Sequence, residues 1–238
     1  MTEAERAARA RIAKSKMIRK KKLHQHIAVA VLILIGVIGL IIMGVKSNKS
    51  RETEGTGWKI TSEKYIDVRP ELDVQLLPVN KYSRPGKALE QVKGIVIHYT
   101  ANPGTSAQQN RDYFANLAKS HETSASSHFV IGLDGEIIQC IPCDEIAYAS
   151  NERNQDTIAI ECCIEDDTGQ FNDKTYHSLI SLVTWLIGRY DLGIEDVIRH
   201  YDVTGKNCPK YFVEHEDAWE NFKSDLASYI AQNGVDKH

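Results

Sequence analysis

The sequence predicts an α/β fold, a single domain with a central mixed β-sheet flanked by helices and preceded by one N-terminal transmembrane helix. Three observations support this fold class. Short apolar runs rich in β-branched residues alternate with segments whose apolar residues recur at helical spacing. One pair of apolar runs flanks Asp134-Gly135, a dipeptide that favours a hairpin and hence an antiparallel pair of strands. Near the N-terminus, nineteen consecutive residues carry no charge.

The first 45 residues have the pattern of a membrane anchor. Residues 1–26 contain nine Lys or Arg and two acidic residues, and residues 27–45 form the uncharged stretch. At about 1.5 Å per residue, a helix of that length crosses a hydrocarbon core of about 30 Å. No small-residue cleavage site follows, so we expect a retained helix rather than a cleaved signal peptide. The basic flank predicts a single-pass cell-membrane protein with a cytoplasmic N-terminus and an extracytoplasmic domain.

The segment after the predicted membrane helix is expected to be a tether. Residues 46–64 are polar with two glycines, and prolines at 70, 78 and 85 predict an extended arm rather than a helix over 65–87. The tether is therefore assigned to 46–79 and the compact domain to 80–238. From Glu52 onward the chain has 17 Lys or Arg and 30 Asp or Glu, a difference of −13. Such a surface repels polyphosphate, and nucleic acid is therefore not expected as a partner.

The first elements of the domain are a strand, a helix and a hairpin. The apolar run within 93–100 predicts a buried strand that ends at His98. A helix should follow, with Ser106 as N-cap and Gln109 in the capping-box position. Its inner face is expected to carry Tyr113, Phe114 and Leu117. Two strands joined by a two-residue turn at Asp134-Gly135 come next.

A further strand and two helices complete the prediction. Alternation within 157–163 puts Ala159, Glu161 and Cys163 on one face of a strand, with Glu161 in an otherwise apolar setting. Helical spacing predicts a long packed helix over 174–191, begun by Asn172 or Asp173 and closed by Gly193. The same spacing in Trp219, Phe222, Leu226, Tyr229 and Ile230 predicts a C-terminal helix that ends near Gly234.

The stretch RHYDVTGKNCPK contains the strongest chemical signal. His200 and Cys208 lie eight positions apart across a polar, turn-prone connection that can deliver two ligands to one point from a loop. Zinc accepts imidazole nitrogen and thiolate sulfur, and a catalytic zinc has three protein ligands and one open position. His98, at a strand end, is the best-placed third ligand, and His128 is its competitor. Each of these residues taken alone is more often structural, so the combination carries the hypothesis.

Four ordered motifs, GIVIHYTA, SSHFVIGLDGEIIQ, TIAIE and RHYDVTGKNCPK, resemble those of the zinc-dependent N-acetylmuramoyl-L-alanine amidases, a family that includes phage amidases and peptidoglycan recognition proteins. The resemblance covers about residues 80–232. It implies that His98, His200 and Cys208 bind Zn²⁺. Lys206 matches a family lysine two residues before the last ligand, and Glu161 matches a glutamate that many members have at the end of the third motif.

The implied reaction is hydrolysis of the amide between N-acetylmuramic acid and L-alanine of the stem peptide, in peptidoglycan or muropeptides. A bound zinc ion would lower the pKa of its water from about 16 toward 7 and polarise the carbonyl. Glu161 would transfer the proton to the leaving amine, and Lys206 would stabilise the oxyanion. Several members have tyrosine where this chain has Ser127, so a phenol that could assist catalysis is absent and the catalytic role is assigned mainly to Glu161. His128 is expected to be a site-lining, substrate-binding or packing residue.

Other assignments stay open at the level of sequence. Arg84, Asn151 and Arg153 are candidates for binding glycan or peptide, although for Arg84 a solvated turn is favoured over a substrate role. Cys140 and Cys143 form a C-x-x-C pair, but there is no second such pair to complete a metal site. A disulfide that involves Cys140, Cys143, Cys162 or Cys163 and buried free thiols are equally open, and no pairing is assigned. Two alternatives to the enzyme are a peptidoglycan-binding module that has lost its metal and a scaffold that acts through its anchor.

Overall fold

The computed structural model describes residues 64–237, which belong to one compact unit, Trp58–His238. The predicted basic segment 1–26, the predicted transmembrane helix 27–45 and residues 46–63 lie outside the described residues. Among the described helices, none combines the length and the apolar character that a membrane span requires.

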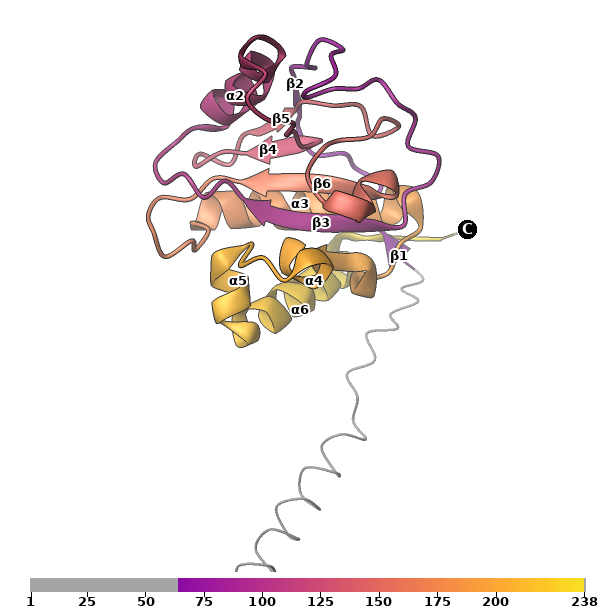
Figure 1. Ribbon diagram of the computed structural model, residues 1–238. Coiled ribbons are helices and arrows are strands. Elements are labelled where there is room, and N and C mark those ends of the chain that lie inside the picture. The colour runs from indigo at the N-terminus through magenta and orange to yellow at the C-terminus, as the bar shows by residue number, and fades with distance from the viewer. Residues whose placement is uncertain (1–63, 238) are drawn as a thin grey trace, which may run out of the picture. The chain divides into compact units, whose positions relative to one another are not determined.

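The centre of the domain is a six-stranded mixed sheet (Figure 1). Its strand order is β2-β5-β4-β6-β3-β7, where β4 and β5 are antiparallel and every other neighbouring pair is parallel. In chain order the strands are β2 (Asp73–Val74), β3 (Gly94–Tyr99), β4 (Phe129–Ile131), β5 (Ile137–Gln139), β6 (Thr157–Cys162) and β7 (Val197–Arg199). The mixed sheet that the sequence predicts is therefore confirmed.

Helices cover both faces of this sheet. They are α2 (Ala107–Ser120), α3 (Asp173–Tyr190), α4 (His200–Thr204), α5 (Lys210–Glu214) and α6 (Glu216–Asn233), with two 3₁₀ turns, η1 (Asn151–Gln155) and η2 (Ile194–Asp196). Figure 1 shows α3 behind β3 and β6, while α4, α5 and α6 lie together beyond β3 and α2 lies near β4 and β5. The arrangement is that of an α/β domain.

The alternation of side chains along each strand decides what the two faces contain. Ile158, Ile160 and Cys162 join the larger apolar cluster, which includes the inner faces of α3 and α6. Cys163 packs in a second cluster with Phe114 of α2. Because successive side chains of a strand point to opposite faces, Glu161 lies on the face away from α3, as its alternation predicts.

The folded unit begins earlier than the sequence predicts. Within the segment assigned to the tether, β1 (Lys64–Tyr65) pairs antiparallel with the C-terminal β8 (Val235–Asp236), and β2 forms an edge of the main sheet. Ile66 and Leu77 are buried in the two apolar clusters. Residues 64–79 thus contribute strands and core residues, because pairing and burial compensate for their short, proline-interrupted pattern.

The start of α2 matches the prediction, but its inner face is narrower. Ser106 Oγ accepts a hydrogen bond from the Gln109 N–H at 3.2 Å, and the Gln109 side chain accepts from the Ser106 N–H at 2.9 Å, which completes the capping box. Phe114 and Leu117 are buried, whereas Tyr113 is 45 % exposed. Its assignment to the inner face is corrected, because Tyr113 precedes Phe114 by one residue and points about 100° away on the helix.

The loop of the hairpin and the C-terminal end of helix α3 also differ from the prediction. The Gly132 N–H donates to Glu136 O at 2.9 Å, so three residues, not two, form the hairpin loop, and Gly135 takes a φ of 86° as such loops require. Asn172 caps α3 by accepting from the Thr175 N–H. The helix ends at Asp191 in the left-handed conformation rather than at Gly193.

Candidate metal centre

The site forms where three adjacent parallel strands end. His98 of β3 and Glu161 of β6 are register partners, so their side chains share a face of the sheet near its carboxyl edge. On the other side of β3, β7 ends at Arg199, and His200 follows at once as the first residue of α4. The sequence places His200 in a loop, whereas the structure gives it a strand before and a helical turn after. The carboxyl edge of parallel strands is the usual place for a ligand site in α/β folds.

Cys208 reaches the same edge through a tight return of the chain. Gly205 ends α4 with a φ of 75°, a conformation that glycine adopts without strain. The Tyr201 N–H then donates to Cys208 O at 2.8 Å, and the Cys208 N–H donates to Lys206 O at 2.7 Å. These bonds fold residues 205–208 back over the start of α4, so that the spacing of eight residues brings the thiol beside the imidazoles.

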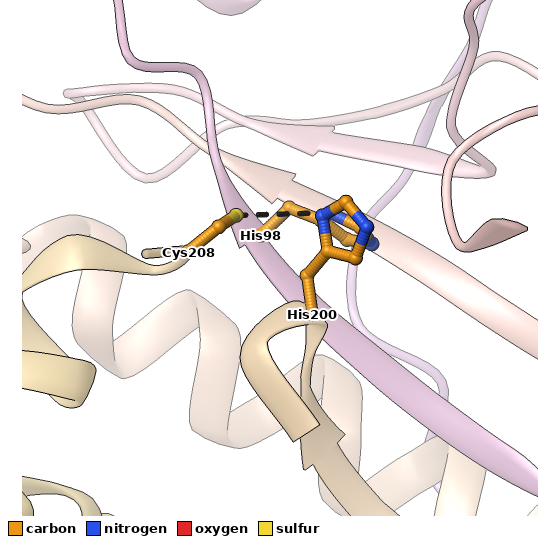
Figure 2. Close-up of side chains that lie close together, drawn as sticks. All are labelled: His98, His200 and Cys208. Atoms are coloured by element: carbon orange, nitrogen blue, oxygen red, sulfur yellow. Dashed lines mark hydrogen bonds between the residues drawn. The ribbon is translucent and has the colours of Figure 1, made fainter. Parts of the chain in front are cut away.

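The three predicted ligands converge (Figure 2). One ligand atom from each of His98, His200 and Cys208 lies within 4.8 Å of the others. Cys208 Sγ is 3.8 Å from His98 Nδ1, and the two imidazole rings have centroids 4.6 Å apart. All three residues are buried, with exposures of 2 %, 6 % and 2 %. His128 is not part of this group, so of the two histidines considered for the third ligand only His98 lies with His200 and Cys208.

The donor set fits a zinc ion. His200 Nδ1 is buried without a hydrogen-bond partner, which is costly for a polar atom unless something else occupies its lone pair. Burial, followed by the charges of His200 and Lys206, lowers the pKa of His98 well below its usual value, so that its imidazole is neutral. Burial, followed by the charge of Glu161, raises the pKa of Cys208 to about 12, and a bound cation would reverse this effect. Two neutral imidazoles and a sulfur are ligands that zinc prefers.

Glu161 and Lys206 line the same cavity. The cavity has a volume of ≈ 370 Å³ and includes all three candidate ligands in its wall. Glu161 Oε2 is buried without a hydrogen-bond partner. Burial raises the pKa of Glu161 to about 8, although the charge of Lys206 opposes this shift. A carboxyl group with such a pKa exchanges protons near neutral pH, while the exposed ammonium of Lys206 adds positive charge at the rim.

Of the four residues predicted to bind substrate, only Asn151 lines this cavity. Arg84 forms two bonds to the Glu145 carboxylate, of 2.8 and 2.6 Å, and a third to Leu77 O at 2.7 Å. Arg153 pairs with Asp156 at 2.7 Å. Each guanidinium group is paired with an acid of the domain and neither lines the cavity, so the structure does not bring Arg84 or Arg153 to the candidate site.

His128 is a structural residue. It is 1 % exposed, its Nδ1 accepts from the Ala159 N–H at 2.9 Å, and its Nε2 donates to Glu145 O at 2.9 Å. Burial lowers its pKa to about 4, which keeps the ring neutral and the two bonds intact. The ring ties β6 to the loop after β5, so the expectation that it lines the site is corrected.

Several polar residues line the cavity although no sequence pattern predicts them as part of the site. The wall also contains Ser124, Ser126, Tyr148 and Asn154. They come from the segments before β4 and before β6, whose composition indicates only turns. Ser150, which contacts His98, was missed for the same reason.

Comparison with known proteins gives consistent results. The model of the N-acetylmuramoyl-L-alanine amidase family (Amidase_2) matches residues 88–211. The chain is 34% identical over 182 residues to the N-acetylmuramoyl-L-alanine amidase BlyA of Bacillus subtilis (strain 168), covering 68% of this chain and 48% of the relative. It is 36% identical over 173 residues to CwlL of Bacillus licheniformis, covering 67% and 47%. The chain thus spans about half the length of the curated relatives it matches.

Solved structures resemble the same region. The catalytic domain of XlyA superposes with a TM-score of 0.56 at 28% identity, covering 66% of this chain and 99% of that one. A mutant endolysin from Bacillus subtilis superposes with a TM-score of 0.55 at 29% identity, covering 66% and 98%.

Proposed function

The chain belongs to the N-acetylmuramoyl-L-alanine amidase family, and from this premise we propose that it hydrolyses the amide between N-acetylmuramic acid and L-alanine of the peptidoglycan stem peptide. The observation that carries the proposal is the convergence of two buried imidazoles and a thiol in the wall of a cavity that also contains Glu161.

His98, His200 and Cys208 would hold Zn²⁺ in this site. When bound, zinc acts as a Lewis acid toward the substrate carbonyl and makes water more acidic. The three ligands come from the ends of β3 and β7 and from the loop after α4, so their positions depend on the sheet and not on the metal alone. Such a preformed site needs little rearrangement to bind an ion.

Glu161 and Lys206 would carry the remaining chemistry. Glu161, with a pKa of about 8, can accept a proton from the attacking water and give it to the nitrogen of the leaving L-alanine. Lys206 lies in the same cavity wall, where its charge can stabilise the oxygen that becomes negative during attack. Both groups act on atoms that change charge, which is where catalytic stabilisation is most effective.

We also propose that the chain works at the outer face of the cell membrane. The proposal rests on the uncharged stretch 27–45 and the basic segment before it. Retention of the protein in membranes after alkaline carbonate extraction, and its loss from them when residues 1–45 are removed, would support the anchor. Recovery of the full chain in the soluble fraction would refute it.

The activity is tested by the products of a purified muropeptide. The full chain, purified in detergent, should release stem peptide with a free L-alanine amine, lose this activity to a chelator and regain it with zinc. His98→Ala and Cys208→Ala should bind no stoichiometric zinc and release no peptide. If zinc-loaded protein binds the muropeptide tightly but leaves it intact, the chain is a binding module instead.

A further inference from the structure

One turn of the chain contacts both candidate histidine ligands. Ser150 Oγ lies 3.1 Å from His98 Nε2, and Asn151 Oδ1 lies 3.2 Å from His200 Nε2. The two residues are neighbours at the start of η1, directly before β6. A single short segment therefore meets the far side of each ring.

These contacts favour one position of the proton on each ring. A neutral imidazole has one N–H group and one lone pair, and the hydrogen bond of one nitrogen decides the role of the other. Asn151 Oδ1 can only accept, so His200 Nε2 must donate to it, which leaves Nδ1 as the lone pair. That Nδ1 is the buried nitrogen without a partner. In His98, Nδ1 faces Cys208 Sγ and Nε2 faces the Ser150 hydroxyl, which is able to accept from an Nε2–H, so these contacts accommodate the same division.

The turn is itself held in place. Asn154 Oδ1 accepts from the backbone N–H groups of Ala149 and Ser150, at 3.0 and 2.6 Å. Ser150 is fully buried, and Asn151 has a φ of 53°, in the left-handed region that asparagine tolerates better than most residues. A multiply bonded turn that is anchored by the buried Ser150 and holds Asn151 in a less favourable conformation is a suitable support for two side chains that must keep a fixed direction.

We infer that Ser150 and Asn151 are positioning residues that hold both histidines as the Nε2–H tautomer and direct their Nδ1 lone pairs toward Cys208. The inference rests on the metal site of the proposed function and reassigns Asn151, which the sequence suggested as a substrate contact. Loss of such a supporting hydrogen bond typically lowers metal affinity by about 10- to 100-fold.

The experiment separates the hydrogen bond from the backbone conformation. In the full chain, Asn151→Gly keeps the left-handed φ but removes the acceptor, whereas Asn151→Asp keeps an acceptor at the same place. Zinc affinity, measured by competition with a chromogenic chelator, should fall about 10- to 100-fold in the glycine variant and stay at or above the wild-type value in the aspartate variant. Zinc affinity should likewise fall in Ser150→Ala and be retained in Ser150→Thr. Equal zinc affinity in the wild type and in Asn151→Gly and Ser150→Ala would overturn the inference.

A second measurement needs no metal. Long-range ¹H–¹⁵N spectra of the ¹⁵N-histidine-labelled, metal-free chain distinguish protonated from unprotonated ring nitrogens. Wild-type His98 and His200 should be Nε2–H, and each should become a mixture of tautomers when its partner is removed. His128, whose tautomer is set by the Ala159 N–H, is the internal reference that should not change. If the wild type binds no zinc, the proposed function fails. The positioning role fails separately, if the tautomers of His98 and His200 are the same in the wild type and in the Ser150→Ala and Asn151→Gly variants.

Discussion

Replacing Glu161 by glutamine is expected to stabilise the metal-free protein while removing most of its proposed activity. The carboxyl group has a buried Oε2 without a partner, and burial raises its pKa from 4.5 to about 8. Glutamine has nearly the same shape but never ionises. The comparison therefore isolates the cost of holding a charge at this position.

The magnitude follows from the two pKa values. Below pH 4.5 the carboxyl is protonated in both the native and the unfolded state, so the variant and the wild type should be equally stable. Between pH 4.5 and about 8 the native state retains a proton that the unfolded state has lost, so wild-type stability decreases as the pH rises. At about 1.4 kcal/mol per pH unit, the interval sets a ceiling of roughly 5 kcal/mol. Since the residue is partly exposed, we expect about 2 kcal/mol in favour of glutamine at about pH 9.

The assay is urea unfolding of both metal-free proteins at about pH 4 and about pH 9, followed by muropeptide hydrolysis with zinc. The gain in stability should appear only at the higher pH, and kcat should fall by about 10²- to 10⁴-fold because the proton acceptor is lost. A glutamine variant that is less stable than the wild type at about pH 9 would refute the burial argument. A variant with full activity would refute the role of Glu161.

Three further replacements test other parts of the structure. Lys206→Met should lower kcat about 10²- to 10³-fold with a smaller change in KM, whereas Lys210→Met, at the first residue of α5 and bonded to a backbone oxygen, should leave both constants near wild type. Arg84→Met should destabilise the domain by about 1–3 kcal/mol, since it leaves Glu145 unpaired, and a selective rise in KM would instead restore Arg84 as a substrate residue. Ser106→Ala should cost about 1 kcal/mol in urea unfolding, and no change would mean that the capping box contributes nothing.

Local patterns in the sequence gave reliable information about elements and their faces. The apolar run that ends at His98 is β3, and the alternation that isolates Glu161 describes β6 correctly. The cap of α2 follows from two side chains three residues apart. These features depend on interactions between near neighbours, which a sequence states directly. The hairpin loop was predicted one residue too short, because a Gly in the left-handed conformation suits a loop of either length.

The roles of isolated polar residues were much harder to predict. Arg84 and Arg153 are of a residue type that often binds ligands, yet each is paired with an acid of the same domain. The acid that pairs with Arg84 is 61 positions away, and no local pattern indicates that such a pair will form. His128 was a plausible ligand until its two backbone partners were known.

The sequence by itself determined the chemical identity of the site: two histidines, a cysteine, a glutamate and a lysine in motifs of fixed spacing. Only the tertiary structure decided that β6, β3 and β7 lie side by side, so that His98, His200 and Cys208 meet at one edge of the sheet. The physical reason is that side-chain chemistry is a property of each residue, whereas strand order and hydrogen-bond partners arise from packing the whole chain. The turn that supports both imidazoles belongs to this second kind of information.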